Sequence, residues 1–255
     1  MRNWLVPLLV AASLAGCANE DGLSSALQAA GAQPVSGGTS ADQPQFDPFA
    51  QNTGYRPLRD VIKNPSVAEV MKPGSLPEMA VGRADAPVTI IKYASLTCPY
   101  CRQFHATTYP QLKREYIDTG KVRFILREFP IGFQSGAATV ALRCAKPERY
   151  FELYGKFMSQ QNAWVSQEVR RDPIFKIASQ VGMTRAEFDA CYENQGMIAA
   201  LNEVKERGRT LGVIGTPNFF VNGQLVKTVL GMPEIRQMVD PIIASQSRPH
   251  TAAAN

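Results

Sequence analysis

The segment 88–105 constrains the fold most strongly, because an apolar run leads directly into a pair of cysteines. Residues 88–94 are mostly β-branched or aromatic, which predicts a strand buried on both faces. Cys98 and Cys101 follow at once, and Pro99 between them suits the first position of a helix, where its missing N–H would be unpaired in any case. We therefore expect a strand, a tight connection and a helix that begins at the cysteines.

This placement favours redox chemistry at Cys98. The unpaired N–H groups and the dipole at a helix N-terminus stabilise a thiolate, so we expect Cys98 to be the attacking sulfur and Cys101, one turn further along, to be the resolving thiol. A zinc or copper site and a static disulfide are the alternatives. Because His105 and His250 are the only histidines, we predict neither a metal nor another cofactor. His105 shares a helix face with Cys101 and is expected to pack or cap.

Beyond this segment, the apolar pattern predicts an α/β protein. The helix that begins at Pro99 is expected to bend near Pro110 and to end at Gly120, which can take the left-handed conformation of a helix cap. The next strand, residues 121–129, should lie parallel to the first. The pair Asn222-Gly223 between two apolar runs predicts a hairpin turn. The other expected elements are a short helix within 58–72, four or five helices within 136–211, strands at 216–221 and 224–229, and a helix at 233–244.

The N-terminus carries the features of a secretory signal. Arg2 precedes an apolar run at residues 4–12, which is too short to span a bilayer, and small residues then lead to Cys17. The sequence Leu14-Ala15-Gly16-Cys17 resembles the bacterial lipoprotein box, whose cysteine receives a lipid and becomes the new N-terminus. This resemblance implies a lipoprotein signal peptide at 1–16 and lipidation of Cys17. An ordinary cleaved signal with a chance cysteine is the alternative.

Composition agrees with a separate role for Cys17. Five cysteines are an odd number, and an unpaired one needs an explanation in an oxidising compartment. Residues 18–57 are rich in Ala, Gly, Ser, Gln and Pro without apolar periodicity, so we predict a lipid-anchored flexible tether over 17–75. A disordered tail is expected at 246–255. The 27 basic and 22 acidic residues are scattered, which argues against nucleic-acid binding.

Five further motifs follow one another along the chain. They are Gly-Arg-Ala-Asp-Ala-Pro-Val at 82–88, Cys-Pro-Tyr-Cys-Arg-Gln-Phe-His at 98–105, Thr-Gly-Lys-Val-Arg-Phe at 119–124, Arg-Glu-Phe-Pro at 127–130 and Gly-Thr-Pro-Asn-Phe-Phe-Val-Asn-Gly at 215–223. Together they resemble the DsbA family of bacterial thiol–disulfide oxidoreductases over residues 76–245. The resemblance implies a thioredoxin fold with a helical domain inserted at about 136–211.

The resemblance also implies a wall opposite the cysteines. Pro217 is expected to be cis and to face the Cys98–Cys101 pair, and Thr216 to offer backbone groups to a substrate peptide in a strand-like pairing. A trans turn proline is the alternative.

Two residues depart from the family pattern. Tyr100 stands where many members have a histidine that helps to stabilise the thiolate, so Pro99 and Tyr100 are expected to tune the redox potential without fixing its value. Lys92 lies six residues before Cys98, where thioredoxin-like proteins commonly carry a buried acid. A buried lysine without a partner is costly. Either Lys92 reaches solvent or an acid, or it lies near the cysteines and favours the thiolate.

Cys144 and Cys191 are the two cysteines that remain once the redox pair and Cys17 are assigned. Some members of the resembled family have a second disulfide, which implies that these two cysteines pair within the helical insertion. Such a bond would stabilise the fold by about 4 kcal/mol in the chain-entropy account. Two separate buried thiols are the alternative.

These observations predict a thiol–disulfide oxidoreductase of the bacterial cell envelope, periplasm-facing and lipid-anchored at Cys17. It would introduce disulfides into reduced or unfolded secreted proteins and be reoxidised by a membrane partner. We expect a monomer, because prolines interrupt residues 58–72 and leave no sustained heptads. One alternative is a reductase or isomerase kept reduced by a membrane donor, since threonine precedes the proline in such relatives. The other is a lipoprotein that binds peptides or metal without catalysis.

Overall fold

The computed structural model describes residues 61–246. The predicted signal peptide, the lipidation site Cys17, residues 17–60 of the tether and all but the first residue of the predicted tail lie outside the described residues. Within the described part, the search for a helix with the length and apolarity needed to cross a membrane finds none.

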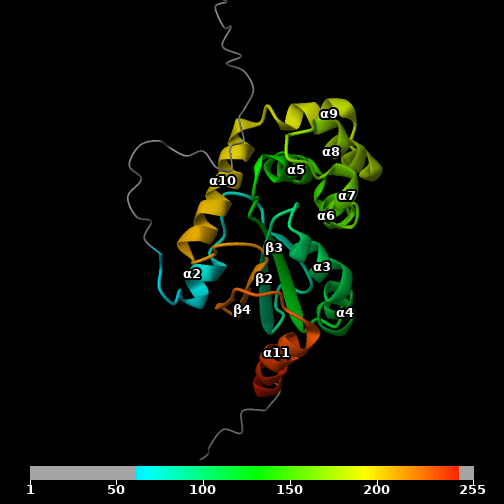
Figure 1. The fold of residues 1–255 in the computed structure, drawn as a ribbon. Coiled ribbons are helices and arrows are strands. Elements are labelled where there is room, and N and C mark those ends of the chain that lie inside the picture. Colours follow the sequence, from blue (N-terminus) through cyan, green and yellow to red (C-terminus); the bar gives the residue numbers. More distant parts are fainter. Residues whose placement is uncertain (1–60, 247–255) are drawn as a thin grey trace, which may run out of the picture. The chain divides into compact units, whose positions relative to one another are not determined.

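A five-stranded mixed sheet organises the fold, in the order β1-β3-β2-β4-β5. The central strand β2 runs parallel to β3, and the other neighbouring strands are antiparallel (Figure 1). This sheet with its covering helices confirms the predicted α/β class. The strands are β1 (Met79–Val81), β2 (Val88–Ala94), β3 (Val122–Glu128), β4 (Asn218–Val221) and β5 (Gln224–Val226).

The hairpin at the end of the sheet forms where the sequence predicts it. Asn222 and Gly223 both have positive φ, at 43° and 86°, which is the conformation of a two-residue hairpin turn. β5 is shorter than predicted and ends at Val226. β1 was not predicted, because an edge strand of three half-buried residues leaves no alternating pattern in the sequence.

Alternation along β2 buries side chains on both faces of the sheet, as predicted. Ile90 and Ala94 belong to the larger core cluster, which also contains residues of the cysteine helix. Ile91 and Tyr93 belong to a second cluster on the other face. Lys92 lies two residues from both Ile90 and Ala94, and alternate residues of a strand point to the same face of the sheet. Its side chain therefore enters the larger core, on the same face as the cysteine helix.

The helix after β2 bends and ends as predicted. It begins at Pro99, and the helical path breaks at Thr108, two residues before Pro110. Gly120 ends this segment with a φ of 75°, and a Cβ there would lie 2.7 Å from the side chain of Arg83. The helices outside the insertion are α2 (Val67–Met71), α3 (Pro99–Thr107), α4 (Tyr109–Leu112), the π-helical turn η2 (Lys113–Ile117) and α11 (Met232–Gln246).

The helical insertion starts earlier and contains more helices than predicted. It begins at Phe133, and it has six α-helices instead of four or five. One extra break lies at Gln160, whose non-helical backbone separates α6 from α7 without a proline or glycine to mark it. α5 packs against α6, α8 and α9 (Figure 1). The elements are α5 (Phe133–Cys144), η3 (Pro147–Arg149), α6 (Tyr150–Ser159), α7 (Gln161–Trp164), α8 (Arg171–Ala178), η4 (Ser179–Val181), α9 (Arg185–Cys191) and α10 (Gln195–Thr210).

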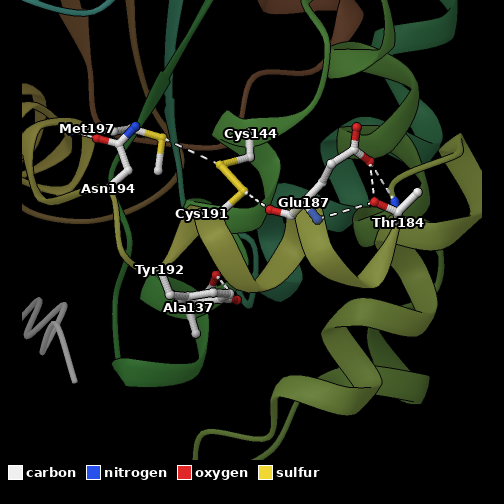
Figure 2. The surroundings of a disulfide bond; sticks show 8 residues. All are labelled: Ala137, Cys144, Thr184, Glu187, Cys191, Tyr192, Asn194 and Met197. Atoms are coloured by element: carbon white, nitrogen blue, oxygen red, sulfur yellow. Dashed lines mark hydrogen bonds between the residues drawn. A yellow bond between two sulfur atoms is a disulfide. The ribbon is translucent and has the colours of Figure 1, made fainter. Parts of the chain in front are cut away.

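A disulfide joins Cys144 at the end of α5 to Cys191 at the end of α9 (Figure 2). The two Cα atoms lie 6.0 Å apart, and the sulfur of Met197 lies 3.9 Å from Cys144 Sγ. The Tyr192 hydroxyl donates a hydrogen bond to the Ala137 carbonyl of α5 at 2.9 Å. The disulfide and this hydrogen bond together hold α9 against α5.

Residues 66–71 pack against the sheet, although the prediction assigns them to the flexible tether. Val70 is fully buried in the second core cluster, and its carbonyl accepts a hydrogen bond from Arg127 of β3 at 2.8 Å. The neighbouring carbonyl of Glu69 accepts one from Arg207 of α10 at 2.8 Å. The predicted tether boundary at residue 75 therefore does not hold for this segment, because buried apolar area and two arginines fix it.

Candidate active site

Cys98 is the N-cap residue of α3, at the end of the connection that follows β2. Its backbone is extended, with φ −74° and ψ 120°, and Pro99 begins the helix. The backbone N–H of Cys101 points back and donates to Cys98 Sγ at 3.3 Å. The local sequence thus produces a sulfur that receives one of the unpaired N–H groups of the helix start.

The two thiols differ in acidity. The hydrogen bond from the Cys101 thiol, together with backbone N–H groups of Tyr100 and Cys101, lowers the pKa of Cys98 to about 6 against the opposing effect of partial burial. Burial raises the pKa of Cys101 well above its ordinary value, since the side chain is fully enclosed. At neutral pH the pair therefore holds a partly accessible thiolate beside a buried thiol.

The Thr216–Pro217 peptide bond is cis and lies against this pair. The Thr216 carbonyl lies 3.1 Å from Cys98 Sγ and accepts a hydrogen bond from it when Cys98 is a protonated thiol. Asn218 fixes the turn, because its amide donates to the Pro217 carbonyl at 2.9 Å. A hydrogen bond to the Thr216 side chain also helps to lower the pKa of Cys98. The structure thus brings Thr216 and Pro217 to the cysteines.

Lys92 lies in the core beside the cysteine helix, with 1% of its surface exposed. Its Nζ donates to the Tyr154 hydroxyl at 3.1 Å and to the Cys101 carbonyl at 3.4 Å. Burial lowers the pKa of this lysine, while negative charge at Cys101 and Cys98 would raise it. Of the two predicted placements, the structure has the one near the cysteines.

Tyr100 and His105 take different positions on α3. The Tyr100 side chain is 58% exposed, so it reaches the chemistry through its backbone N–H instead of its ring. His105 packs between Tyr109 and Tyr154, with ring centroids 5.3 Å and 5.4 Å away. Burial lowers the pKa of His105 to about 4, which leaves the imidazole neutral at neutral pH. This packing agrees with the expectation for His105.

Two side chains of the insertion contribute to the site and were missed by the sequence analysis. Gln161 of α7 donates its side-chain amide to the carbonyls of Leu96 at 2.7 Å and Cys98 at 3.1 Å, which holds the connection before α3. Tyr154 of α6 reaches Lys92. Both residues lie about 60 positions from their partners, and no local pattern marks such a contact.

Exposed apolar side chains lie close in sequence to residues of the site. Ile214, two residues before Thr216, is 80% exposed. Ile131 is also exposed, and its carbonyl accepts a hydrogen bond from Thr97, the residue before Cys98, at 3.3 Å. Tyr100, which lies between the two cysteines, is a third exposed side chain of this kind.

Comparison with known proteins agrees with this geometry. A family model described as "Thioredoxin" matches residues 75–241, more than half of the chain. The crystal structure of Wolbachia pipientis alpha-DsbA1 is similar with a TM-score of 0.63 and 25% identity, over 71% of this chain and 100% of that one. The chain belongs to the DsbA-like thioredoxin family. The predicted thioredoxin fold with a helical insertion is confirmed.

Curated relatives carry names of the same kind. A "Putative protein-disulfide oxidoreductase" of Rickettsia bellii is 32% identical over 57% of this chain and 57% of its own length. A protein of that name from Rickettsia conorii is 32% identical over 66% of this chain and 62% of its own length. The matched region therefore spans less than two thirds of these relatives. BdbD from Bacillus subtilis, at 18% identity and a TM-score of 0.61 over 73% of this chain and 100% of that one, shares the fold.

Proposed function

We propose that the chain is a thiol–disulfide oxidoreductase that introduces disulfides into secreted proteins. The observation that carries this proposal is the unequal pair, a Cys98 thiol with its pKa lowered to about 6 beside a Cys101 thiol with its pKa raised. Stabilising the Cys98 thiolate stabilises the reduced state of the pair. A pair whose reduced state is stabilised gives its disulfide away more readily.

The residues around the pair receive their roles in this proposal. Thr216 and Pro217 form the wall on which a substrate peptide pairs, since the Thr216 carbonyl already lies 3.1 Å from Cys98 Sγ. We propose that the exposed side chains of Tyr100, Ile131 and Ile214 bind apolar residues around the substrate cysteine. Pro99 and Tyr100 tune the potential by fixing the helix start, and Lys92 does so by its charge beside Cys101.

The setting of the activity is also a proposal. A secretory signal at 1–16 and a lipid on Cys17 would hold the domain by a tether on the periplasmic side of the envelope. There it would act as a monomer on reduced secreted proteins and be reoxidised by a membrane partner. Labelling of the full chain with a radioactive fatty acid, with Cys17→Ser as the control, tests the anchor: label that persists in the variant contradicts it.

The direction of electron flow is tested by the reduction potential of the Cys98–Cys101 pair against glutathione. Related proteins span about −270 to −120 mV, and a disulfide donor belongs near −120 mV. A value near −270 mV contradicts donation and favours the second candidate, a reductase or isomerase, which the threonine before the cis proline supports.

A second measurement separates catalysis from peptide binding. We expect Cys98→Ser to abolish oxidation of a reduced peptide while leaving the fold intact, since the residue is a partly exposed cap. Full activity in this variant would contradict the redox role and favour a binding protein.

A further inference from the structure

The sheet carries a cavity on the face opposite the cysteine helix. Its volume is about 300 Å³, and its walls come from β2, β3, α10 and the connection after α2, residues 72–75. Tyr93 and Ile125 belong to the second core cluster, and Arg127 points to the same face because it lies two residues after Ile125. Residues 72–75 and Glu203 are exposed, so the cavity opens to solvent. The cavity is therefore separate from the redox pair.

The most buried polar side chains in the lining are Tyr93, at 0% exposure, and Arg127, at 7%. Arg127 forms an ion pair with Glu78 at 2.6 Å, and its Nη1 donates to the Tyr93 hydroxyl at 3.2 Å. Among residues 61–246, the Tyr93 hydroxyl itself donates to no acceptor. Burial raises the pKa of this phenol, so it keeps its proton. A buried O–H group without an acceptor favours a ligand that supplies one.

Two further basic side chains line the cavity, Lys72 after α2 and Arg207 on α10. Neither forms an ion pair within the described part of the chain. Arg207 donates from Nη2 to the Glu69 carbonyl at 2.8 Å, and its other N–H groups have no partner among the described residues. The nearby Glu69 carboxylate is engaged elsewhere, since it accepts hydrogen bonds from Ser66. Both cations therefore remain available to an anion.

The lining holds more positive than negative charge. Glu78 neutralises Arg127 through their ion pair. Lys72 and Arg207 then remain against Glu203, which is the one acid among the described residues of the lining. One positive charge is left over, and a ligand with one negative charge would balance it.

We propose that this cavity binds a small aliphatic carboxylate. Its oxygens would accept hydrogen bonds from the Tyr93 hydroxyl and from Arg207, whose guanidinium has the parallel N–H groups that suit a carboxylate. The hydrocarbon chain would lie against Pro73 and Val204, the apolar side chains of the opening. A volume of about 300 Å³ equals that of about ten water molecules, so the cavity has room for a chain as well as the charged group.

Such a ligand would hold the segment 66–75 on the sheet. Lys72 belongs to this segment, whereas Arg207 belongs to α10. A carboxylate between them would have to leave before the segment could open, so it should slow hydrogen exchange of the Val70 amide, which is hydrogen-bonded within the segment. At a ligand concentration ten times the dissociation constant, we expect this exchange to be about tenfold slower.

Isothermal titration calorimetry of the full-length chain with hexanoate at pH 7 tests the site. We expect saturable binding of one hexanoate per chain, with a dissociation constant of about 1 mM or less. Hexylammonium has the same chain length and the opposite charge, and it should not bind. Inorganic phosphate lacks the hydrocarbon chain and should bind at least about tenfold more weakly than hexanoate.

Three variants locate the binding. Arg207→Met and Lys72→Met each remove a cation from the lining and should weaken hexanoate binding about tenfold, the effect of losing a hydrogen bond to a charged group. Lys72 is exposed, so its replacement leaves the fold intact. Arg209→Met is the matched control, because it removes the same charge from the same helix at a residue that pairs with Glu206 outside the lining. Its affinity should stay within about twofold of wild type.

Absence of saturable hexanoate binding would overturn the proposal. So would equal binding of hexylammonium or phosphate, an unchanged affinity in both Arg207→Met and Lys72→Met, or an equal loss in Arg209→Met. Exchange of the Val70 amide that is as fast with saturating hexanoate as without it would also contradict the assigned position of the ligand.

Discussion

The lowered pKa of Cys98 can be followed by its reaction with iodoacetamide across pH, and the Cys101→Ala variant tests its main cause. The Cys101 thiol is the largest contributor to the shift from 9.0 to about 6. A hydrogen bond to a charged group contributes about 1.5 kcal/mol, which corresponds to about one pKa unit. We therefore expect the pH midpoint of the reaction of Cys98 with iodoacetamide to rise by about one pH unit in Cys101→Ala. Backbone N–H groups that remain in the variant keep it below 9.0.

The midpoint is a better readout than the rate. At pH 7 a thiol with a pKa of about 6 is about 90% thiolate, against about 1% for a pKa of 9.0. Each thiolate is also less nucleophilic when its pKa is lower, because the logarithm of its rate constant falls by about 0.4–0.5 for each pKa unit. The two effects together make the thiol with the pKa of about 6 react only about fourfold faster at pH 7 than one with a pKa of 9.0. The pH midpoint keeps the full shift.

Mass spectrometry after timed alkylation gives the rate at Cys98 separately from other sites. The double variant Cys144→Ala, Cys191→Ala is the control and should keep a midpoint of about 6, since that disulfide lies outside the site. A wild-type midpoint near 9.0, or one that stays at about 6 in Cys101→Ala, would refute the reasoning.

The same shift links redox state to stability. The folded pKa of Cys98 lies below its unfolded value, so the thiolate adds stability to the reduced chain above about pH 9, and this contribution is lost as pH falls through about 6. The oxidised chain has no thiolate and lacks this dependence.

Three other substitutions have defined expectations. Gln161→Ala removes the donor to two carbonyls before α3 and should lower the free energy of unfolding by about 1–3 kcal/mol in urea titrations, whereas the surface change Gln180→Ala should stay within about 0.5 kcal/mol. Replacing Cys144 and Cys191, 47 positions apart, by alanine should cost about 4 kcal/mol, and an unchanged value would contradict the cross-link. His105→Phe should leave the pH dependence of the free energy of unfolding unchanged between about pH 5 and 8, because burial holds the His105 pKa at about 4. An inflection in that range that the variant loses would contradict this expectation.

The sequence predicts the elements whose signals are local. The β-branched run of β2, Pro99 at a helix start, Gly120 at a helix end and the Asn222-Gly223 turn each encode their own geometry. The short helix α2 also has a local signal, the capping box from Ser66 to Glu69.

The remaining features depend on contacts between distant segments. β1 exists because it pairs with β3, and nothing in its three residues requires a strand. Gln161 is an ordinary helical glutamine until the fold brings it to the connection before Cys98. For Lys92 the sequence identifies an unusual residue type, but only the packing of α6 against α3 shows that Tyr154 is its partner.

Transfer of a disulfide from the oxidised full-length chain to a reduced two-cysteine peptide tests the central claim most directly. Mass spectrometry of the alkylated mixture counts the bonds on both sides. The account predicts one peptide disulfide for each chain, with Cys98 and Cys101 becoming available to alkylation together. A peptide that stays reduced while the Cys98–Cys101 bond remains intact would contradict it.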